Sequence, residues 1–451
     1  MSRVDIGALP IFLSHPDISP FPMRTFSLAT DDRNAVFTAL QRPTHDLARY
    51  REIARPIIDA VRSRGDDALL EYTEQFDDVR LTSLRVPQAE RDAASARIPK
   101  TLRDAIETAI KNVTAFHREN ITEHTIDVGV GVRCWRAIRP LDSAGLYVPG
   151  GTAPLVSTAI MLAIPALLAG VGKPVMCTPP QKDGAVAPSI LYACERIGIT
   201  DIYRVGGAQA IAAMGYGTQT IPKVCKIAGP GNAYVTAAKA EVGSDPNGAA
   251  IDMLAGPSEL LIIADATADP RFVAADLLSQ AEHDRSSQVV LLSTDAALID
   301  AVQRAGEEQL HNLPRKDIAK VALAASVAVL TPSLEDAIML ANVYAPEHLS
   351  IQTQNPQSLL PQITNAGSIF LGSFSPETIG DYCSGTNHVL PTSGLARTTG
   401  GVSVRTFQKT LTIQELSLDG LRSLSTTATA LARAEGLEAH ARAVEVRLAS
   451  V

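Results

Sequence analysis

The chain has 451 residues, 46% of them hydrophobic and 20% charged, a balance that predicts a globular protein of two or three domains. Its formal net charge of −8 disfavours nucleic-acid and anionic-membrane partners, because phosphate-rich surfaces repel it. Five cysteines without a CxxC pair, and an N-terminus without a signal-peptide pattern, favour a reducing cytoplasm over a disulfide framework.

The N-terminal third of the chain has a helical pattern with few strand signals. Apolar residues recur at helical spacing over residues 48–64, 66–76 and 102–116. We therefore expect a largely helical region before residue 145.

From residue 144 the chain changes to short apolar runs that alternate with helical segments. The expected strands lie within residues 144–151, 173–180, 201–207 and 223–232, and the alternation resumes within residues 258–265, 287–294, 327–332, 349–353 and 367–372. Strand–helix alternation at this spacing predicts two doubly wound parallel sheets, with a boundary near residues 245–257. After about residue 400 the pattern is helical again.

Residues 153–172 form an uncharged stretch long enough to cross a bilayer. The stretch is solitary, contains Pro165 and follows a glycine turn. We therefore interpret it as a helix buried between a sheet and its neighbours, which is apolar on all sides for the same reason.

Three strand–glycine–helix junctions lie at residues 148–151, 205–207 and 228–232. Such turns present backbone N–H groups that suit a pyrophosphate, but tight turns of this kind are also needed in any α/β sheet. None has the G-x-G-x-x-G fingerprint. If NAD binds here, the nearby polar groups able to hold it are Tyr147, Gln209 and Asn232.

Two short motifs place polar side chains close together. Gln280 and His283 lie three residues apart and share a helix face, so both are candidate Zn²⁺ ligands, although a capped helix end is the commoner explanation. Glu347 and His348 are adjacent in a loop and could divide acid–base work, although a surface turn explains them more simply.

A glycine-punctuated loop at residues 380–388 carries Asp381 and His388, both candidate ligands or substrate contacts. Cys383 in the same loop has no neighbour that would activate its thiol. His440 lies at the edge of an apolar stripe in the last helix, where periodicity alone favours a packing role.

Taken together, these motifs resemble histidinol dehydrogenase over nearly the whole chain. The matching strings are GLYVPGG, VGGAQAIAA, KIAGPGNAYV, IDMLAGPSE, DLLSQAEH, YAPEHL, GSIFLG, GDYCSGTNHVLPT and AEGLEAH, and the helical string RGDDALLEYTEQFD precedes them. They are long and stand in the family's order.

The resemblance implies a division of the chain as well as a fold. It implies two Rossmann-like, aldehyde-dehydrogenase-like large domains with small helical pieces at both termini. We expect an N-terminal extension over residues 1–25, a first large domain from residues 26–145 with 258–400, a second from residues 146–257 on the NAD side, and a C-terminal tail over residues 401–451 that reaches a partner subunit.

The resemblance also implies the site residues and their ligands. One Zn²⁺ per subunit would be held by Gln280, His283 and Asp381, with His440 supplied by the partner subunit of an intertwined homodimer. The implied acid–base pair is Glu347 and His348. The implied L-histidinol contacts are Ser258, His348, Glu435 and His388, and the four zinc ligands would also touch the substrate. The implied NAD contacts are Tyr147, Gln209 and Asn232.

The implied reaction is the oxidation of L-histidinol to L-histidine through the aldehyde, with two NAD and no cysteine. His348 would take the hydroxyl proton, and Glu347 would activate the water that attacks the aldehyde. One alternative is a relative that oxidises another small polyol or a sulfonated diol on the same scaffold. The other is a non-catalytic nucleotide-binding protein, because fold alone does not fix function.

Overall fold

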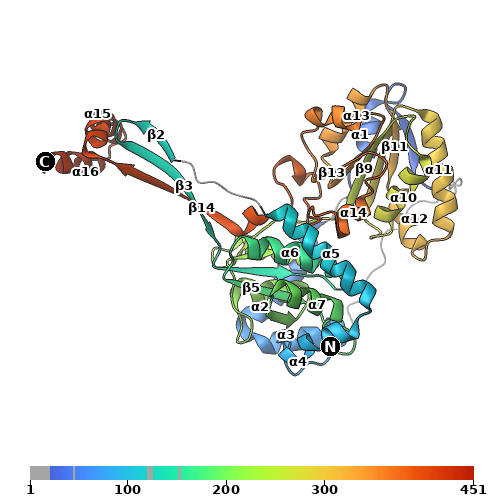
Figure 1. Ribbon diagram of the computed structural model, residues 1–451, viewed down its shortest axis with the longest axis horizontal. Coiled ribbons are helices and arrows are strands. Elements are labelled where there is room, and N and C mark those ends of the chain that lie inside the picture. The colour runs from blue at the N-terminus through green and yellow to red at the C-terminus, as the bar shows by residue number, and fades with distance from the viewer. Residues whose placement is uncertain (1–20, 44–45, 119–124, 151–153, 451) are drawn as a thin grey trace. The chain divides into compact units, whose positions relative to one another are not determined.

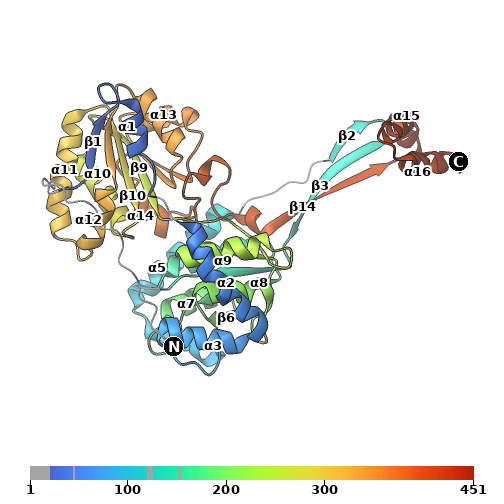
Figure 2. The same ribbon diagram turned by 180° about the vertical axis from the view of Figure 1, so that it is seen from behind.

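The structure, a computed structural model, describes residues 21–43, 46–118, 125–150 and 154–450. The chain forms two compact units, drawn in Figures 1 and 2. Unit 1 comprises Met1–Arg49, Met253–Tyr382 and Leu390–Gly401, and unit 2 comprises Tyr50–Asp252, Cys383–Val389 and Val402–Val451.

Unit 1 is built on a six-stranded parallel sheet with the order β1-β11-β10-β9-β12-β13. Its strands are β1 (Arg24–Ser27), β9 (Glu259–Ala264), β10 (Gln288–Ser293), β11 (Val327–Leu330), β12 (His348–Gln352) and β13 (Ser368–Leu371). Starting from β9, the chain adds β10 and β11 on one side and then returns to add β12 and β13 on the other. The predicted doubly wound sheet is confirmed.

Helices cover both faces of this sheet (Figures 1 and 2). Leu260 and Ile262 of β9 pack under α10 (Pro270–Ala281), α11 (Ala296–His311) and α12 (Lys316–Ala324). Leu261 and Ile263 pack on the other face, under α1 (Arg33–Ala39) and α13 (Leu334–Tyr344). Because neighbouring side chains of a strand alternate between faces, the continuous apolar run of β9 serves two cores at once.

Unit 2 contains a five-stranded parallel sheet with the order β6-β5-β4-β7-β8. Its strands are β4 (Ser143–Tyr147), β5 (Lys173–Thr178), β6 (Asp201–Arg204), β7 (Lys226–Ala228) and β8 (Ala250–Ile251). The winding from β4 is the same as the winding from β9 in unit 1. This sheet therefore also reverses direction next to its first strand, which is where α/β proteins place nucleotide ligands.

Two groups of helices pack in unit 2. The first group is α5 (Lys100–His117), α6 (Val156–Leu168) and α7 (Pro188–Ile197), with α4 (Gln88–Asp92) beside α7. The second group contains α8 (Gly207–Tyr216) and α9 (Ala233–Ser244), against which α3 (Asp66–Asp77) and α2 (Leu47–Arg64) lie. The helices expected at 48–64, 66–76 and 102–116 are confirmed as α2, α3 and α5.

The uncharged stretch after residue 153 contains α6, a helix of 13 residues. Ten of its residues are buried, among them Met161 and Leu162, so α6 is a core helix of unit 2, as expected. Within the described ranges, the structure has no helix that combines the length and the apolar character needed to cross a bilayer.

Unit 2 also contains a three-stranded antiparallel sheet with the order β14-β3-β2, formed by β2 (Thr125–Gly129), β3 (Val132–Pro140) and β14 (Gln408–Leu416). The expectation of few strands before residue 145 and only helices after residue 400 was therefore wrong. The paired strands β3 and β14 lie far apart in the sequence. β14 is largely exposed and β3 buries only Val132 and Ala137, so no buried apolar run marks either strand. The C-terminal helices α15 (Leu418–Ala434) and α16 (Glu438–Ala449) follow it.

The observed units differ from the expected domains in two large segments. Residues 402–451, expected as a separate C-terminal tail, belong to unit 2. Residues 50–145 were expected in the first large domain but belong to unit 2. The reason is packing: α5 lies against α6 and α7, and α3 lies against α8. The change of unit at Asp252 falls within the expected boundary region.

Candidate active site

The candidate residues of unit 1 gather at the amino edge of its sheet. Pro346 cannot continue α13, and the chain turns through Ala345, which has a positive φ of 55°, into β12. Glu347 therefore directly precedes β12 and His348 is its first residue. The returning helix α10 brings Gln280 in its last turn to this same edge, because a crossover helix runs antiparallel to its strands.

The His348 imidazole is buried and held in one orientation. Its Nδ1 atom lies 3.0 Å from the backbone carbonyl of Glu259, the first residue of the neighbouring strand β9. A carbonyl only accepts, so Nδ1 carries a hydrogen and donates it. The Nε2 atom is therefore the nitrogen available to take a proton, and it lies 3.5 Å from the Asp381 carboxylate.

Glu347 is buried beside His348. Its carboxylate accepts a hydrogen bond of 2.9 Å from the backbone N–H of Glu259 and lies 3.6 Å from His348 Nδ1. The Glu259 backbone thus holds both members of the pair, one through its N–H and the other through its carbonyl. Glu259 is itself fixed by Arg42, whose guanidinium donates to both carboxylate oxygens at 2.5 and 2.8 Å.

The short helix α14 (Glu377–Tyr382) supplies two more carboxylates. Glu377 and Asp381 are four residues apart and share one helix face. The Glu377 carboxylate lies 3.4 Å from His348 Nδ1 and accepts a hydrogen bond from the Gln280 amide, while the Gln280 oxygen accepts from the Glu259 N–H at 3.1 Å. His348 is thus surrounded by three acids from two segments, Glu347 beside it and two from α14.

Burial and mutual repulsion set the charge state of this group. Burial raises the pKa of Glu347 to about 8, and burial also raises the pKa of Glu377 to about 8. Burial lowers the pKa of His348, but the carboxylates of Glu377, Glu347 and Asp381 outweigh burial and raise it above its ordinary value. So many buried acids around one imidazole form a group that would be stabilised by a cation.

The structure brings several predicted metal ligands into this neighbourhood. Ligand atoms of His348, Glu377 and Asp381 lie within 4.8 Å of one another, a spacing that suits a bound metal ion. His283 follows α10. Burial lowers the pKa of its imidazole, and the nearby Asp381 carboxylate opposes this shift by favouring the protonated form. Neutral imidazole, carboxylate and amide oxygen are all donors that Zn²⁺ accepts. Ser258 directly precedes Glu259.

The three candidate NAD contacts lie in unit 2, at the carboxyl edge of its sheet. Tyr147 ends β4, and its phenol oxygen accepts a 3.0 Å hydrogen bond from the N–H of Gly207. Gln209 is buried in the first turn of α8. Asn232 caps α9 by accepting from the N–H groups of Tyr234 and Val235. The predicted glycine turns therefore open α8 and α9 as expected.

The remaining predicted residues also lie in unit 2. His388 Nε2 is 3.2 Å from the hydroxyl of Thr158 in α6. Glu435 is the C-cap of α15 and His440 lies in α16, and both side chains are exposed.

Sequence comparison decides the family. The histidinol dehydrogenase family model matches residues 40–448. The chain belongs to the histidinol dehydrogenase family. It is 52% identical over 411 residues to the histidinol dehydrogenase of Vibrio cholerae, covering 91% of this chain and 94% of the relative, and 49% identical over 428 residues to that of Photobacterium profundum, covering 94% and 96%. The crystal structure of histidinol dehydrogenase from Elizabethkingia anophelis matches with a TM-score of 0.91 at 46% identity, over 95% of this chain and 99% of that one.

The sequence analysis missed two acids, Glu377 and Glu259, that the fold places in the buried polar group around His348. Glu377 had a detectable signal, because it stands four residues before Asp381, a spacing that puts both on one helix face. Glu259 had none, because its role depends on Arg42, 217 positions away in the chain.

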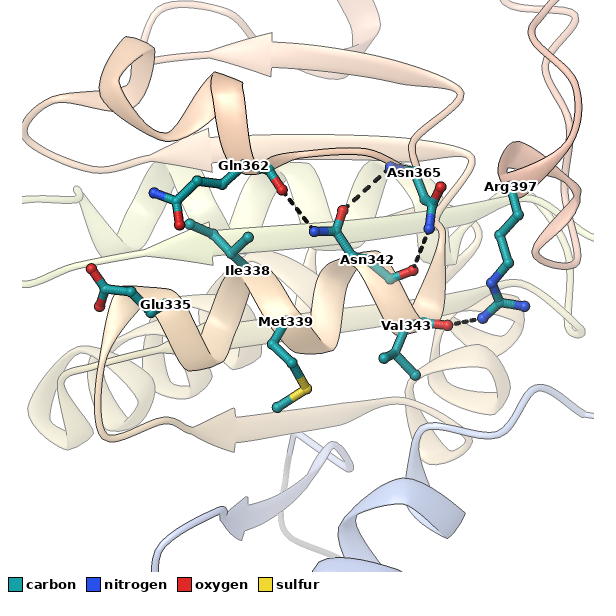
Figure 3. Close-up of a pocket in the computed structure, with 8 residues that line it drawn as sticks. All are labelled: Glu335, Ile338, Met339, Asn342, Val343, Gln362, Asn365 and Arg397. Carbon is teal, nitrogen blue, oxygen red and sulfur yellow. Dashed lines mark hydrogen bonds between the residues drawn. The ribbon is translucent and has the colours of Figure 1, made fainter.

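A separate cavity of about 620 Å³ lies along α13. Figure 3 shows hydrogen bonds between side-chain amides and backbone groups of the residues that line it. The Asn342 side-chain amide donates to the backbone carbonyl of Gln362 at 2.8 Å. The backbone carbonyl of Asn342 accepts from the Asn365 side-chain amide at 3.0 Å. None of the predicted site residues lines this cavity.

Proposed function

We propose that this chain is an oxidoreductase that converts L-histidinol to L-histidine through L-histidinaldehyde, with two NAD, in the last steps of histidine biosynthesis. The observation that carries the proposal is the buried Glu347–His348 pair, held by Glu259 beside Gln280 and Asp381, in a chain of this family. The named relatives do not favour the alternative substrates, another small polyol or a sulfonated diol.

His348 serves as the base for the hydroxyl proton in the zinc-loaded enzyme, where a cation would offset the carboxylates that otherwise raise the pKa of His348. Its Nδ1–H donates to the Glu259 carbonyl, so the proton is taken up at Nε2. The imidazolium that forms is stabilised by Glu347, Glu377 and Asp381. Its burial in the sheet edge keeps the ring from rotating away. Removing this proton makes departure of a hydride from the same carbon favourable.

Glu347 prepares the second oxidation. Its raised pKa makes the carboxylate form a stronger base than an ordinary glutamate, so that it can take a proton from a water that attacks the aldehyde. The hydrated aldehyde then presents a second hydroxyl to His348. One base therefore serves both oxidations.

The residues present fit the two groups that the family implies. We propose that Gln280, His283 and Asp381 would hold Zn²⁺ in one subunit. His283 lies within the influence of the Asp381 charge, and the unpartnered Glu377 oxygen and His348 Nε2 next to them mark a buried polar group that a cation would stabilise. Tyr147, Gln209 and Asn232 would hold NAD at the glycine turns of unit 2. When bound, zinc orients the amino alcohol and NAD accepts the hydride.

We further propose that the active enzyme is a cytoplasmic homodimer with shared sites. The helices α15 and α16 bury only Gly420 and Ala441, and they expose Leu424, Leu431, Leu437 and Val446, which a second copy would cover. His440 would then complete the zinc ligands of the partner, and Ser258, Glu435 and His388 would contact the substrate. All five cysteines are free thiols, which fits a reducing compartment.

The proposal is tested by counting NADH formed per histidinol consumed, before and after chelation. We expect two NADH per histidinol, loss of turnover when metal is removed and recovery with added Zn²⁺. A ratio of one, or full turnover by metal-free enzyme, would overturn the proposal. Non-imidazole alcohols serve as the substrate control and should give little NADH.

A further inference from the structure

A cavity of about 350 Å³ opens at the carboxyl edge of the unit 2 sheet. Gly150, which follows β4, lines it together with Thr178 and Pro179, at the end of β5. Phe76 and Asp77, at the end of α3, complete one side of the cavity. The cavity is thus bounded by the ends of the first two strands in this sheet's winding order.

The winding order gives this position a chemical meaning. In doubly wound dinucleotide-binding sheets, an acidic residue near the end of the second strand binds the ribose hydroxyls of the adenosine half. The second strand here is β5, and it is followed by Pro179, Pro180, Gln181 and Lys182, none of which is acidic. Asp183 comes next, but it does not line the cavity, and its carboxylate accepts from the N–H of Ala185.

Asp77 supplies the missing acid from another part of the chain. Its Oδ2 atom is buried and receives no hydrogen bond from the described residues. Lys182 lies beside it, but the Lys182 ammonium donates to the Asp77 backbone carbonyl and to the Asp78 carboxylate, each at 3.0 Å. Asp77 therefore lines the cavity and keeps unused acceptor capacity on a carboxylate oxygen that is shielded from water, which is costly unless a ligand hydroxyl satisfies it.

Electrostatics connect this carboxylate with the predicted NAD residues. Burial raises the pKa of Tyr147, and the charge of Asp77 raises it further. Burial also raises the pKa of Asp77 itself, as expected of a carboxylate without a hydrogen-bonding partner. Asp77 and Tyr147 thus belong to one neighbourhood at the carboxyl edge of the sheet.

We propose that Asp77 binds the 2′-hydroxyl of the adenosine ribose of NAD and excludes the 2′-phosphate of NADP. The inference rests on the proposed NAD-dependent reaction and adds the residue that selects between the two dinucleotides. A hydroxyl donates to the carboxylate, whereas a phosphate at the same position meets a like charge and offers no hydrogen.

The test compares Asp77→Asn with Glu74→Gln, which removes the same charge three residues earlier on α3, outside the cavity. The zinc-loaded enzyme is assayed with histidinol and either NAD or NADP. For Asp77→Asn we expect KM for NAD to rise by about tenfold or more with kcat little changed, and the NAD-to-NADP ratio of kcat/KM to fall by about a hundredfold. For Glu74→Gln we expect a ratio close to that of the wild type.

A second measurement needs no variant to fold. NAD that carries 2′-deoxyadenosine should show a KM, and a Kd measured by calorimetry without histidinol, each about tenfold higher than those of NAD with the wild-type enzyme. Equal KM values for the two dinucleotides in the wild type would overturn the assignment of Asp77. Wild-type enzyme that reduces no NAD at all would instead overturn the proposed function.

Discussion

The group around His348 in unit 1 and the helices α15 and α16 in unit 2 are built in opposite ways. The side chains of Gln280, Glu347, His348 and Glu377 are buried and held by one another and by strand ends. The C-terminal helices instead expose most of their surface, including Leu431 at 61%. A buried polar group is fixed by its own fold, whereas a helix pair with uncovered apolar side chains gains its stability from further contacts.

The comparison divides the proposed zinc site into a preorganised part and a part that is ordered by assembly. Unit 1 supplies Gln280, His283 and Asp381, whereas the exposed α16 supplies His440. Changes in the buried group should therefore act on chemistry and stability, and changes in the C-terminal helices should act on metal binding and assembly.

The largest effect is expected for His348→Asn. Asn can keep a donor toward the Glu259 carbonyl but has no basic nitrogen at the position of Nε2, so kcat should fall by about 10² to 10⁴-fold with zinc content unchanged. Steady-state NADH formation measures the change. His311→Asn, at the exposed end of α11, is the matched control and should retain activity. A full-rate His348→Asn enzyme would refute the assigned role.

His440→Ala should act on the metal and leave the fold intact. Loss of a direct ligand should weaken zinc binding by more than about a hundredfold, beyond the usual effect of an outer partner. Zinc content after dialysis, read together with the melting temperature, separates ligand loss from unfolding. Arg442→Ala, two residues along the same exposed helix, is the control. Full zinc content in His440→Ala would show that the C-terminal helices supply no ligand.

Arg42→Met tests the support beneath the buried group. Removing the guanidinium leaves the Glu259 carboxylate, 3% exposed, with the Ser393 N–H and without a counter-ion. The free energy of unfolding should fall by about 3 to 5 kcal/mol, measured by urea denaturation. Arg64→Met breaks the exposed pair with Glu71 and should cost less than about 1 kcal/mol. Similar losses in the two variants would contradict this account of Glu259.

Asp276→Asn should give the smallest change, a gain in stability that depends on pH. Burial raises the pKa of Asp276 to about 6, above its unfolded value near 3.8, so the folded state binds its proton more tightly. The carboxylate therefore costs stability above about pH 6 and nothing below about pH 4. The variant should be more stable than the wild type by roughly 1 to 3 kcal/mol at pH 8, with no gain at pH 4. An equal shift at both pH values would exclude this cause.

The parts of the fold that could be predicted are those whose cause is local in the sequence. The apolar run of β9 and the helical spacing of α2, α3 and α5 indicate buried strands and amphipathic helices directly. The pairing of β3 with β14 could not be predicted, because the two strands lie far apart in the chain and neither has a continuous buried apolar run. In β14, the alternation of Thr410, Leu411, Thr412 and Ile413 was nevertheless a strand signal.

The site shows the same limit. Individual motifs identified Glu347, His348 and Gln280, but only the resemblance to the family joined them, since their meeting depends on β9, β12 and α10 sharing one sheet edge. Glu259 and Arg42 act through contacts across 217 positions, which no local pattern encodes. Asp77 stands at the end of an ordinary helix, and its relation to β5 follows only from the folded unit.

The most direct test of the shared site is to mix two inactive variants, His440→Ala and His348→Asn, under conditions that exchange subunits. A mixed dimer holds one site with an intact His348 from one subunit and an intact His440 from the other. After full exchange we expect about a quarter of wild-type activity, because half of the dimers are mixed and each has one complete site. No recovery despite proven exchange would contradict a zinc site shared between subunits.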